Sequence, residues 1–320
     1  MIHILEFEKP IIELEKKIDE MRDLAVAKNL DLSDEINKLI KKSEKLKDEV
    51  YSKLTPWQRV QLARHPERPY TLDYIKRICS SFVEMHGDRL YGDDKAIVCG
   101  MATIEDKKVM LVGQQKGKGT KNNLFRNFGM PNPEGYRKAL RVMKLAAKFN
   151  KPIVTLIDTP GAFPGKGSEE RGVAEAIARN LFEMTTLPVP IVCIVTGEGG
   201  SGGALAIAIG DKVLMFENAI YSVITPEGCA SILLRDPTKA PQMAESLKIT
   251  APDLMELGVI DGIVKEPVGG AHRNYNEAAE SLKWTILNSL NELERLSPEE
   301  RIKNRIDKFG NMGKWIENPK

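Results

Sequence analysis

Short apolar runs alternate with amphipathic stretches through the middle of the chain. The runs are rich in Val, Ile, Leu and Met and have the length of a strand. Between them, apolar residues recur every three or four positions, as on one face of a helix. One such stretch starts at Pro133 after the capping residue Asn132, and another follows the capping residue Ser168. Continuous apolar strands alternating with amphipathic helices are typical of a parallel sheet covered on both faces, so we predict an α/β fold. The expected strands are residues 96–104, 108–113, 153–157, 190–195, 212–216, 219–224 and 258–264.

The same spacing predicts the remaining elements. Residues 72–85 have helical spacing, and residues 105–107 form a hairpin turn between the first two strands. The tail beyond Pro298 is charged, and we expect it to lie at the periphery. Further helices are expected from Pro226 and over residues 205–209, 240–247, 251–257 and 276–296.

Residues 8–52 are highly charged and carry two narrow apolar stripes at helical spacing, one on either side of residues 29–34. Those residues offer a turn, with Ser33 as an N-cap for the second stripe. The pattern predicts an antiparallel helical hairpin over residues 1–54. Narrow stripes are what packing on a partner or on the main body requires, so we expect an extension without chemistry of its own.

Two glycine-bearing turns follow two of the apolar runs. Residues 196–204 read Thr-Gly-Glu-Gly-Gly-Ser-Gly-Gly-Ala, with five glycines among nine residues, and Gly161 lies in the turn that starts at Asp158. In a parallel sheet both turns fall at the carboxyl ends of the strands, where ligands bind. Glycine permits positive φ and lets another molecule approach the main chain. The first amides of the following helix have no intrahelical partner and can hold an anion or a reaction oxyanion. We therefore interpret residues 196–204 as a functional turn rather than a purely structural one.

Composition narrows the function classes. The 320 residues suffice for one large or two ordinary domains, and the net charge of +2 gives no argument for a nucleic-acid or membrane partner. The longest apolar runs are too short to span a bilayer, and the N-terminus lacks the pattern of a signal peptide. The four cysteines are widely spaced, with no C-x-x-C pair, so no zinc knuckle is expected. These features fit a reducing cytoplasm.

Several side chains near the turns could carry chemistry. The segment around Ser201 matches G-x-S-x-G, the nucleophile elbow of α/β-hydrolases, but the only histidine downstream is His272. A hydrolase is therefore one alternative, and a non-catalytic scaffold that docks a partner through the hairpin is another. Asp158 could bind a metal or act as a base, although we favour a side chain that stabilises its own turn. Glu198 and Glu227 are further candidate acids. The basic residues 114–128 could hold phosphates, although no P-loop motif is present.

Five motifs in order carry a resemblance to a known family. The sequence resembles the carboxyltransferase alpha subunit of bacterial acetyl-coenzyme A carboxylase. The resemblance covers nearly the whole chain, including the connector at residues 57–66. The motifs are RNFGMP at 126–131, PEGYRKAL at 133–140, DTPGA at 158–162, GEGGSGGA at 197–204 and SVITPEGCA at 222–230.

The resemblance implies a crotonase-like fold of repeated ββα units, with a carboxyltransferase domain over residues 55–296 between the hairpin and a charged tail, 297–320. It implies transfer of a carboxyl group from carboxybiotin, held on a separate biotin carboxyl carrier protein, to acetyl-coenzyme A. The product is malonyl-coenzyme A for fatty-acid synthesis. A separate beta subunit would complete an α2β2 heterotetramer, contribute the acetyl-coenzyme A side and carry the zinc motif. Biotin carboxylase would join the wider complex, and no metal is expected in this chain.

By the same resemblance, backbone amides stabilise the negative charge that develops on the ureido oxygen of biotin. Gly202 and Gly203 are expected to supply these amides, with Ala204 as a further candidate. No general base from this chain is required, because biotin itself can take the proton from acetyl-coenzyme A. The carboxybiotin pocket is expected to be lined by Gly161, Ala162, Gly200, Ser201 and Ala204.

Overall fold

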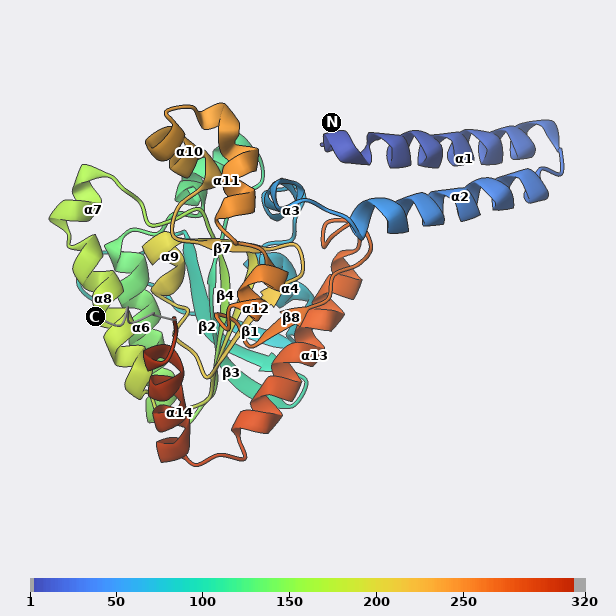
Figure 1. The fold of residues 1–320 in the computed structure, drawn as a ribbon. Helices are drawn as coiled ribbons and strands as arrows, with labels where there is room; N and C mark the ends of the chain where they lie inside the picture. Colours follow the sequence, from blue (N-terminus) through green and yellow to red (C-terminus); the bar gives the residue numbers. More distant parts are fainter. Residues whose placement is uncertain (1–2, 314–320) are drawn as a thin grey trace, which may run out of the picture.

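A computed structural model describes residues 3–313 of the chain, and its centre is one mixed β-sheet (Figure 1). In the described residues the sheet has eight strands in the order β1-β2-β3-β4-β5-β6-β8, with β7 paired to the last residues of β5. The first three strands are antiparallel and the others run parallel from β3 onward. The strands are β1 (Ser81–Glu84), β2 (Ile97–Ile104), β3 (Lys107–Gln114), β4 (Ile153–Thr159), β5 (Ile191–Gly200), β6 (Lys212–Phe216), β7 (Ile220–Ser222) and β8 (Gly262–Val264).

Helices cover both faces of the sheet, as the alternating pattern predicts. Helices α6 and α8 pack together on one face, and α4 and α13 pack together on the other (Figure 1). Within the described residues no helix is both long and apolar enough to cross a membrane. The main-body helices are α3 (Pro56–Ala63), α4 (Thr71–Ile78), α5 (Gly119–Phe125), α6 (Pro133–Lys148), α7 (Lys166–Glu170), α8 (Val173–Thr186), α9 (Ser201–Leu205), α10 (Pro226–Leu234), α11 (Ala240–Ser246), α12 (Ala251–Glu256), α13 (Tyr275–Leu293) and α14 (Pro298–Gly310), with single 3₁₀ turns at Glu6–Glu8, Asn127–Gly129 and Pro237–Lys239.

Strands β4 and β5 form the centre of the sheet. Every residue of β4 is buried, and so is every residue of β5 except Gly200. Both strands therefore read as continuous apolar runs rather than as alternating ones, which is typical of strands buried on two faces. They pair in parallel, with a register shift between Ile157 and Thr159. Their carboxyl ends thus lie at the same edge of the sheet, as expected from the sequence.

The N-terminal residues form the predicted hairpin, which projects from the body as an arm (Figure 1). It consists of α1 (Lys9–Lys28) and α2 (Ser33–Tyr51), which pack against each other. Ile11 and Ile18 of α1 are buried. The expected N-cap at Ser33 is wrong: Ser33 is the first helical residue, and its amide donates to the side chain of Asp31. The apolar stripes are narrow because they face each other.

Several element boundaries differ from the prediction. The helical pattern over residues 72–85 ends at Ile78, after which β1 forms an exposed edge strand. The helix after the glycine turn occupies Ser201–Leu205 rather than residues 205–209. The helix expected after Ser168 is split into α7 and α8, so Ser168 lies inside α7 rather than at a cap.

The expectation of a peripheral tail beyond Pro298 is wrong for α14. Arg305 is almost fully buried and pairs with Asp211 at 2.9 Å, and its guanidinium also donates to the carbonyl oxygens of Leu187 and Val189. Arg301 is buried as well and donates to the carbonyl oxygen of Pro188. These contacts join α14 to the end of α8 and the start of β5. The last seven residues of the expected tail, 314–320, lie outside the described residues.

Candidate functional site

The two glycine turns meet at the carboxyl edge of the sheet. A Cβ atom on Gly200 would lie 2.2 Å from the carbonyl oxygen of Pro160. A Cβ atom on Gly203 would lie 2.4 Å from the carbonyl carbon of Gly161 and 2.5 Å from the amide nitrogen of Ala162. Both positions thus require glycine because the backbones of the two turns are in direct contact. The structure brings together the residues that sequence reasoning placed in one pocket.

In the second turn, Ser201 has a positive φ, whereas the glycines of residues 196–204 do not. Strand β5 continues through Gly200, and Ser201 then adopts φ 49° as the first residue of α9. In the first turn Gly161 has φ 154°. The left-handed conformation at Ser201 is uncommon for a residue with a side chain. The expectation that the glycines of residues 196–204 supply positive φ is therefore wrong, and their common role is close backbone approach.

The start of α9 presents backbone amides at this contact. The N–H groups of Gly202 and Gly203 belong to the first turn of this helix, where backbone amides normally have no intrahelical acceptor. The carbonyl oxygen of Gly202 accepts from the amide of Ala206, which aligns this peptide with the helix. Because the N–H and C=O groups of a trans peptide point in opposite directions, the Gly203 N–H points away from the helix. The arrangement can stabilise a negatively charged oxygen.

A cluster of charged side chains includes one acid from each turn, Asp158 and Glu198. Lys116 Nζ is 2.7 Å from Asp158 Oδ1 and 2.7 Å from Glu198 Oε2. Arg64 continues the cluster from α3, with its Nε 2.6 Å from Glu198 Oε1 and its Nη1 2.5 Å from Glu227 Oε1. The cluster therefore ties the segments just after β3 and α3 to β4, β5 and α10 at one edge. Sequence reasoning had named the three acids but had not identified their basic partners.

Glu198 and Lys116 stay charged at neutral pH. Burial alone would raise the pKa of Glu198, but Lys116 and Arg64 outweigh it and hold that pKa below its ordinary value. Burial alone would lower the pKa of Lys116, but Asp158 and Glu198 raise it well above its ordinary value. A proton is therefore hard to add to Glu198 and hard to remove from Lys116. Neither group is suited to general acid–base catalysis near pH 7.

Asp158 does not stabilise its own turn, so our interpretation of this residue is wrong. Its Oδ1 accepts from the backbone amide of Glu198 at 2.9 Å, which joins the end of β4 to β5. The side chain of the next residue stabilises the turn instead: Thr159 Oγ1 accepts from the Gly161 amide at 3.1 Å and donates to the Gly129 carbonyl oxygen at 2.7 Å. Asp158 therefore acts between strands.

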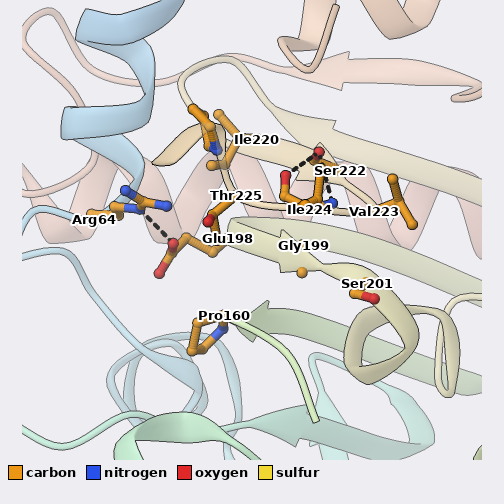
Figure 2. Close-up of a pocket in the computed structure, with 12 residues that line it drawn as sticks. Arg64, Pro160, Glu198, Gly199, Ser201, Ile220, Ser222, Val223, Ile224 and Thr225 are labelled. Carbon is orange, nitrogen blue, oxygen red and sulfur yellow. Dashed lines mark hydrogen bonds and ion pairs between the residues drawn. The ribbon is translucent and has the colours of Figure 1, made fainter. Parts of the chain in front are cut away.

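A pocket opens beside the turns (Figure 2). Arg64, Pro160, Glu198 and Ser201 line it, together with the chain that follows β7. Ser201 also borders a second, mainly apolar cavity of about 270 Å³. The second cavity is lined by Leu205, Ala208, Ile209, Val213, Tyr221, Ser222, Val223, Leu254, Val259, Phe309 and Met312.

A hydrolase would need a histidine hydrogen-bonded to Ser201, and no histidine of the described residues forms that bond. His65 and His272 stack on each other, with ring centroids 3.9 Å apart, at the base of the hairpin. In the described part of the chain neither ring forms a hydrogen bond with Ser201, and His65 is held by backbone groups of His3 and Glu67. The elbow-like φ of Ser201 is therefore not accompanied by a base.

One group of potential metal ligands occurs among the described residues, but both ring nitrogens of its His65 already form hydrogen bonds. Side-chain atoms of Glu8, His65 and His272 lie within 4.8 Å of one another. His65 Nδ1 accepts from the Glu67 amide, so Nε2 carries the proton and donates to the His3 carbonyl oxygen at 3.0 Å. Both nitrogens of His65 are thus in use. That this chain binds no metal stays a prediction.

The sequence matches known proteins over almost its full length. Residues 4–313 match the family described as acetyl co-enzyme A carboxylase carboxyltransferase-like. The acetyl-coenzyme A carboxylase carboxyl transferase subunit alpha of Geobacter metallireducens is 58% identical over 98% of this chain and 98% of its own. The subunit of the same name from Halalkalibacterium halodurans is 57% identical over 97% of this chain and 96% of its own.

Solved structures confirm the expected crotonase-like fold. Transcarboxylase 12S superposes with a TM-score of 0.58 at 19% identity, covering 71% of this chain and 42% of its own. A Pseudomonas malonate decarboxylase hetero-tetramer in complex with coenzyme A gives a TM-score of 0.59 at 13% identity, covering 73% of this chain and 91% of its own. At these identities the structures bear on the fold alone. The match over residues 4–313 and the high identity to the alpha subunits establish more: this chain belongs to the family of carboxyltransferase alpha subunits of acetyl-coenzyme A carboxylase.

Proposed function

We propose that this chain catalyses carboxyl transfer from carboxybiotin to acetyl-coenzyme A, giving malonyl-coenzyme A, the first committed step of fatty-acid synthesis. Carboxybiotin would be presented by a separate carrier protein, and a beta subunit would supply the acetyl-coenzyme A side in an α2β2 assembly. Biotin carboxylase would belong to the wider complex, and the cytoplasm would be its location. Family membership supports the reaction, and the position of the Gly202 and Gly203 amides in the first turn of α9 is the observation that supports the site.

In this proposal the Gly202 and Gly203 amides are the catalytic groups. Release of the carboxyl group leaves negative charge on the ureido oxygen of biotin. The two N–H groups would donate to that oxygen and stabilise the charge without a titrating side chain. The Gly161–Ala162 backbone holds Gly203 in place, because no atom larger than hydrogen fits between them. Gly200 and Ser201 line the pocket beside Arg64, whereas Ala204 is fully buried in α9 and lines neither of the two cavities.

The residues present fit such a substrate. The ureido group is polar, and it would meet main-chain donors at the start of α9. The ring system and alkyl arm of biotin are apolar, and the cavity of about 270 Å³ that begins at Ser201 is lined mainly by apolar side chains. The nearby cations Lys116 and Arg64 are each paired with carboxylates, so they add little net positive field to the pocket.

The test is malonyl-coenzyme A formation from acetyl-coenzyme A and the carboxylated carrier protein. The chain together with its beta partner is expected to form the product, and the chain alone is not. Product formation by the isolated chain would contradict the shared site, and no product from the complex would contradict the proposed reaction. Stoichiometric labelling of Ser201 by a fluorophosphonate would instead favour the hydrolase alternative.

A further inference from the structure

One side chain connects the two glycine turns. Gln114, the last residue of β3, is fully buried. Its Nε2 donates to the carbonyl oxygen of Gly203 at 2.7 Å, and its Oε1 accepts from the backbone amide of Asp158 at 3.1 Å. One partner is an acceptor and the other is a donor, so only one orientation of the side-chain amide satisfies both. The bridge runs from the start of the first turn to the second turn.

The bridge acts on the peptide group that follows Gly203. Because C=O and N–H point in opposite directions across a trans peptide, holding the Gly203 oxygen fixes the plane of this peptide and the direction of the Ala204 N–H. It also fixes ψ of Gly203, the residue whose own N–H the proposed function uses. A glycine has no side chain to restrict these angles, so an external contact must do so.

The backbone of Gln114 is itself fixed. Its carbonyl oxygen accepts from Thr71 Oγ1 at 2.6 Å, and its strand pairs with β2 on one side and β4 on the other. The bridge therefore starts from the rigid centre of the sheet and ends on the turn.

We propose that Gln114 is a positioning residue for carboxyl transfer: its side-chain amide fixes the Gly203–Ala204 peptide and ψ of Gly203, and so holds in place the turn that carries the backbone donors of Gly202 and Gly203. This inference rests on the proposed function. Gln114 touches no substrate in this account and acts only through the Gly203 peptide. Its contribution is expected in the transition state, where the alignment of the donors matters most, and not in the binding of acetyl-coenzyme A.

Two variants of Gln114 separate positioning from packing. Gln114→Met keeps a similar length and removes both hydrogen bonds. Gln114→Glu keeps the shape, and it keeps a donor to Gly203 only while its carboxyl group is protonated. Thr155→Val is the matched control, because it removes one buried hydrogen bond, of 2.7 Å, to the carbonyl oxygen of Ile207 beyond α9.

The assay is steady-state carboxyl transfer by the complex of this chain with its beta partner, between pH 6 and 9, with melting temperature measured in parallel. We expect Gln114→Met to lower kcat about 10- to 100-fold, somewhat less than the loss of a whole oxyanion donor, with an unchanged KM for acetyl-coenzyme A. The ratio of this variant's kcat to that of the wild type should not depend on pH. The same ratio for Gln114→Glu should fall as pH rises and its carboxyl group ionises. Thr155→Val should lower the melting temperature comparably and keep kcat within about twofold.

The inference is overturned if both Gln114 variants keep the wild-type kcat, or if Thr155→Val loses as much kcat as Gln114→Met. A loss that appears only in KM for acetyl-coenzyme A would also overturn it. An inactive wild-type complex would instead contradict the proposed function, and the inference with it.

Discussion

A single methyl group at Gly203 tests whether contact between the two turns matters for the reaction. The added Cβ atom would lie 2.4 Å from the Gly161 carbonyl carbon, whereas ordinary contacts begin at 3.4 Å. The turns must therefore separate by about 1 Å, because overpacked atoms in a dense interior have to move apart. Such overpacking typically costs about 1–3 kcal/mol of stability. A displaced oxyanion donor typically costs about 3–4 kcal/mol in the transition state, or a 100- to 1,000-fold lower kcat.

The assay compares Gly203→Ala with a methyl group added at the opposite edge of the sheet. A Cβ atom on Gly210 would lie 2.6 Å from Cys193 Sγ, which is an equally severe overlap. Gly210→Ala should therefore lose similar stability and keep its turnover. The melting temperature, the mass of the complex with the beta partner and kcat for malonyl-coenzyme A formation are measured for both. Gly203→Val, with its larger β-branched side chain, should lose activity at least as completely.

The reasoning is refuted if Gly203→Ala assembles normally and turns over at close to the wild-type rate. It is also refuted if Gly210→Ala loses turnover to the same extent at an equal loss of melting temperature, since overpacking anywhere would then suffice.

Three further predictions concern the serine, the histidine pair and the assembly. Ser201→Ala should keep most of the carboxyltransferase activity, and fluorophosphonate probes should leave the wild type unlabelled, because no histidine of the described chain hydrogen-bonds Ser201. Burial and the neighbouring His272 lower the pKa of His65 from 6.5 to about 4, so the unfolded chain binds more protons between these values. His65 therefore stabilises the fold fully above pH 6.5 and loses up to about 3 kcal/mol of stability as pH falls toward 4, a slope that chemical denaturation should show reduced in His65→Gln. Finally, the isolated chain should form no malonyl-coenzyme A, the beta partner should restore activity with two-to-two stoichiometry by native mass measurement, and deletion of residues 1–50 should weaken assembly. A deletion variant that assembles like the wild type would contradict a docking role for the hairpin.

The sequence predicted the centre of the sheet well because burial on both faces leaves a clear signal. The runs at residues 153–157 and 190–195 contain little but branched apolar residues, and both became central strands. The edge strand β1 leaves no such signal. It is four residues long and mostly exposed, and Phe82 happens to continue the spacing of α4. Only pairing with β2, which local spacing does not contain, distinguishes it from a helix.

Helix α14 shows the same limit for charged residues. A segment rich in charge is normally solvated, so the tail beyond Pro298 was expected at the surface. Arg305 is buried because Asp211 and several carbonyl oxygens satisfy its guanidinium. Asp211 lies 94 residues away along the chain. The local periodicity of a sequence cannot predict a contact between residues that far apart.

The candidate site divides in the same way. Its backbone part could be predicted, because glycine density and placement after two central strands are local properties of the sequence. Its side-chain support could not, since Gln114 reaches Gly203 across 89 positions and Arg64 reaches Glu198 across 134. Those residues lie on other strands and helices and share no motif with the turn.

The support also explains why a site without titrating catalysts can rely on charged neighbours. The charges of Lys116 and Glu198 are fixed because each raises the cost of changing the other's protonation. Asp158 and Gln114 link this fixed network to the backbone of both turns. The field at the Gly202 and Gly203 amides is therefore set before a substrate arrives and changes little across neutral pH. In the proposed function this is what oxyanion stabilisation requires, because donors that need not reorganise during the reaction give the largest stabilisation of the developing charge.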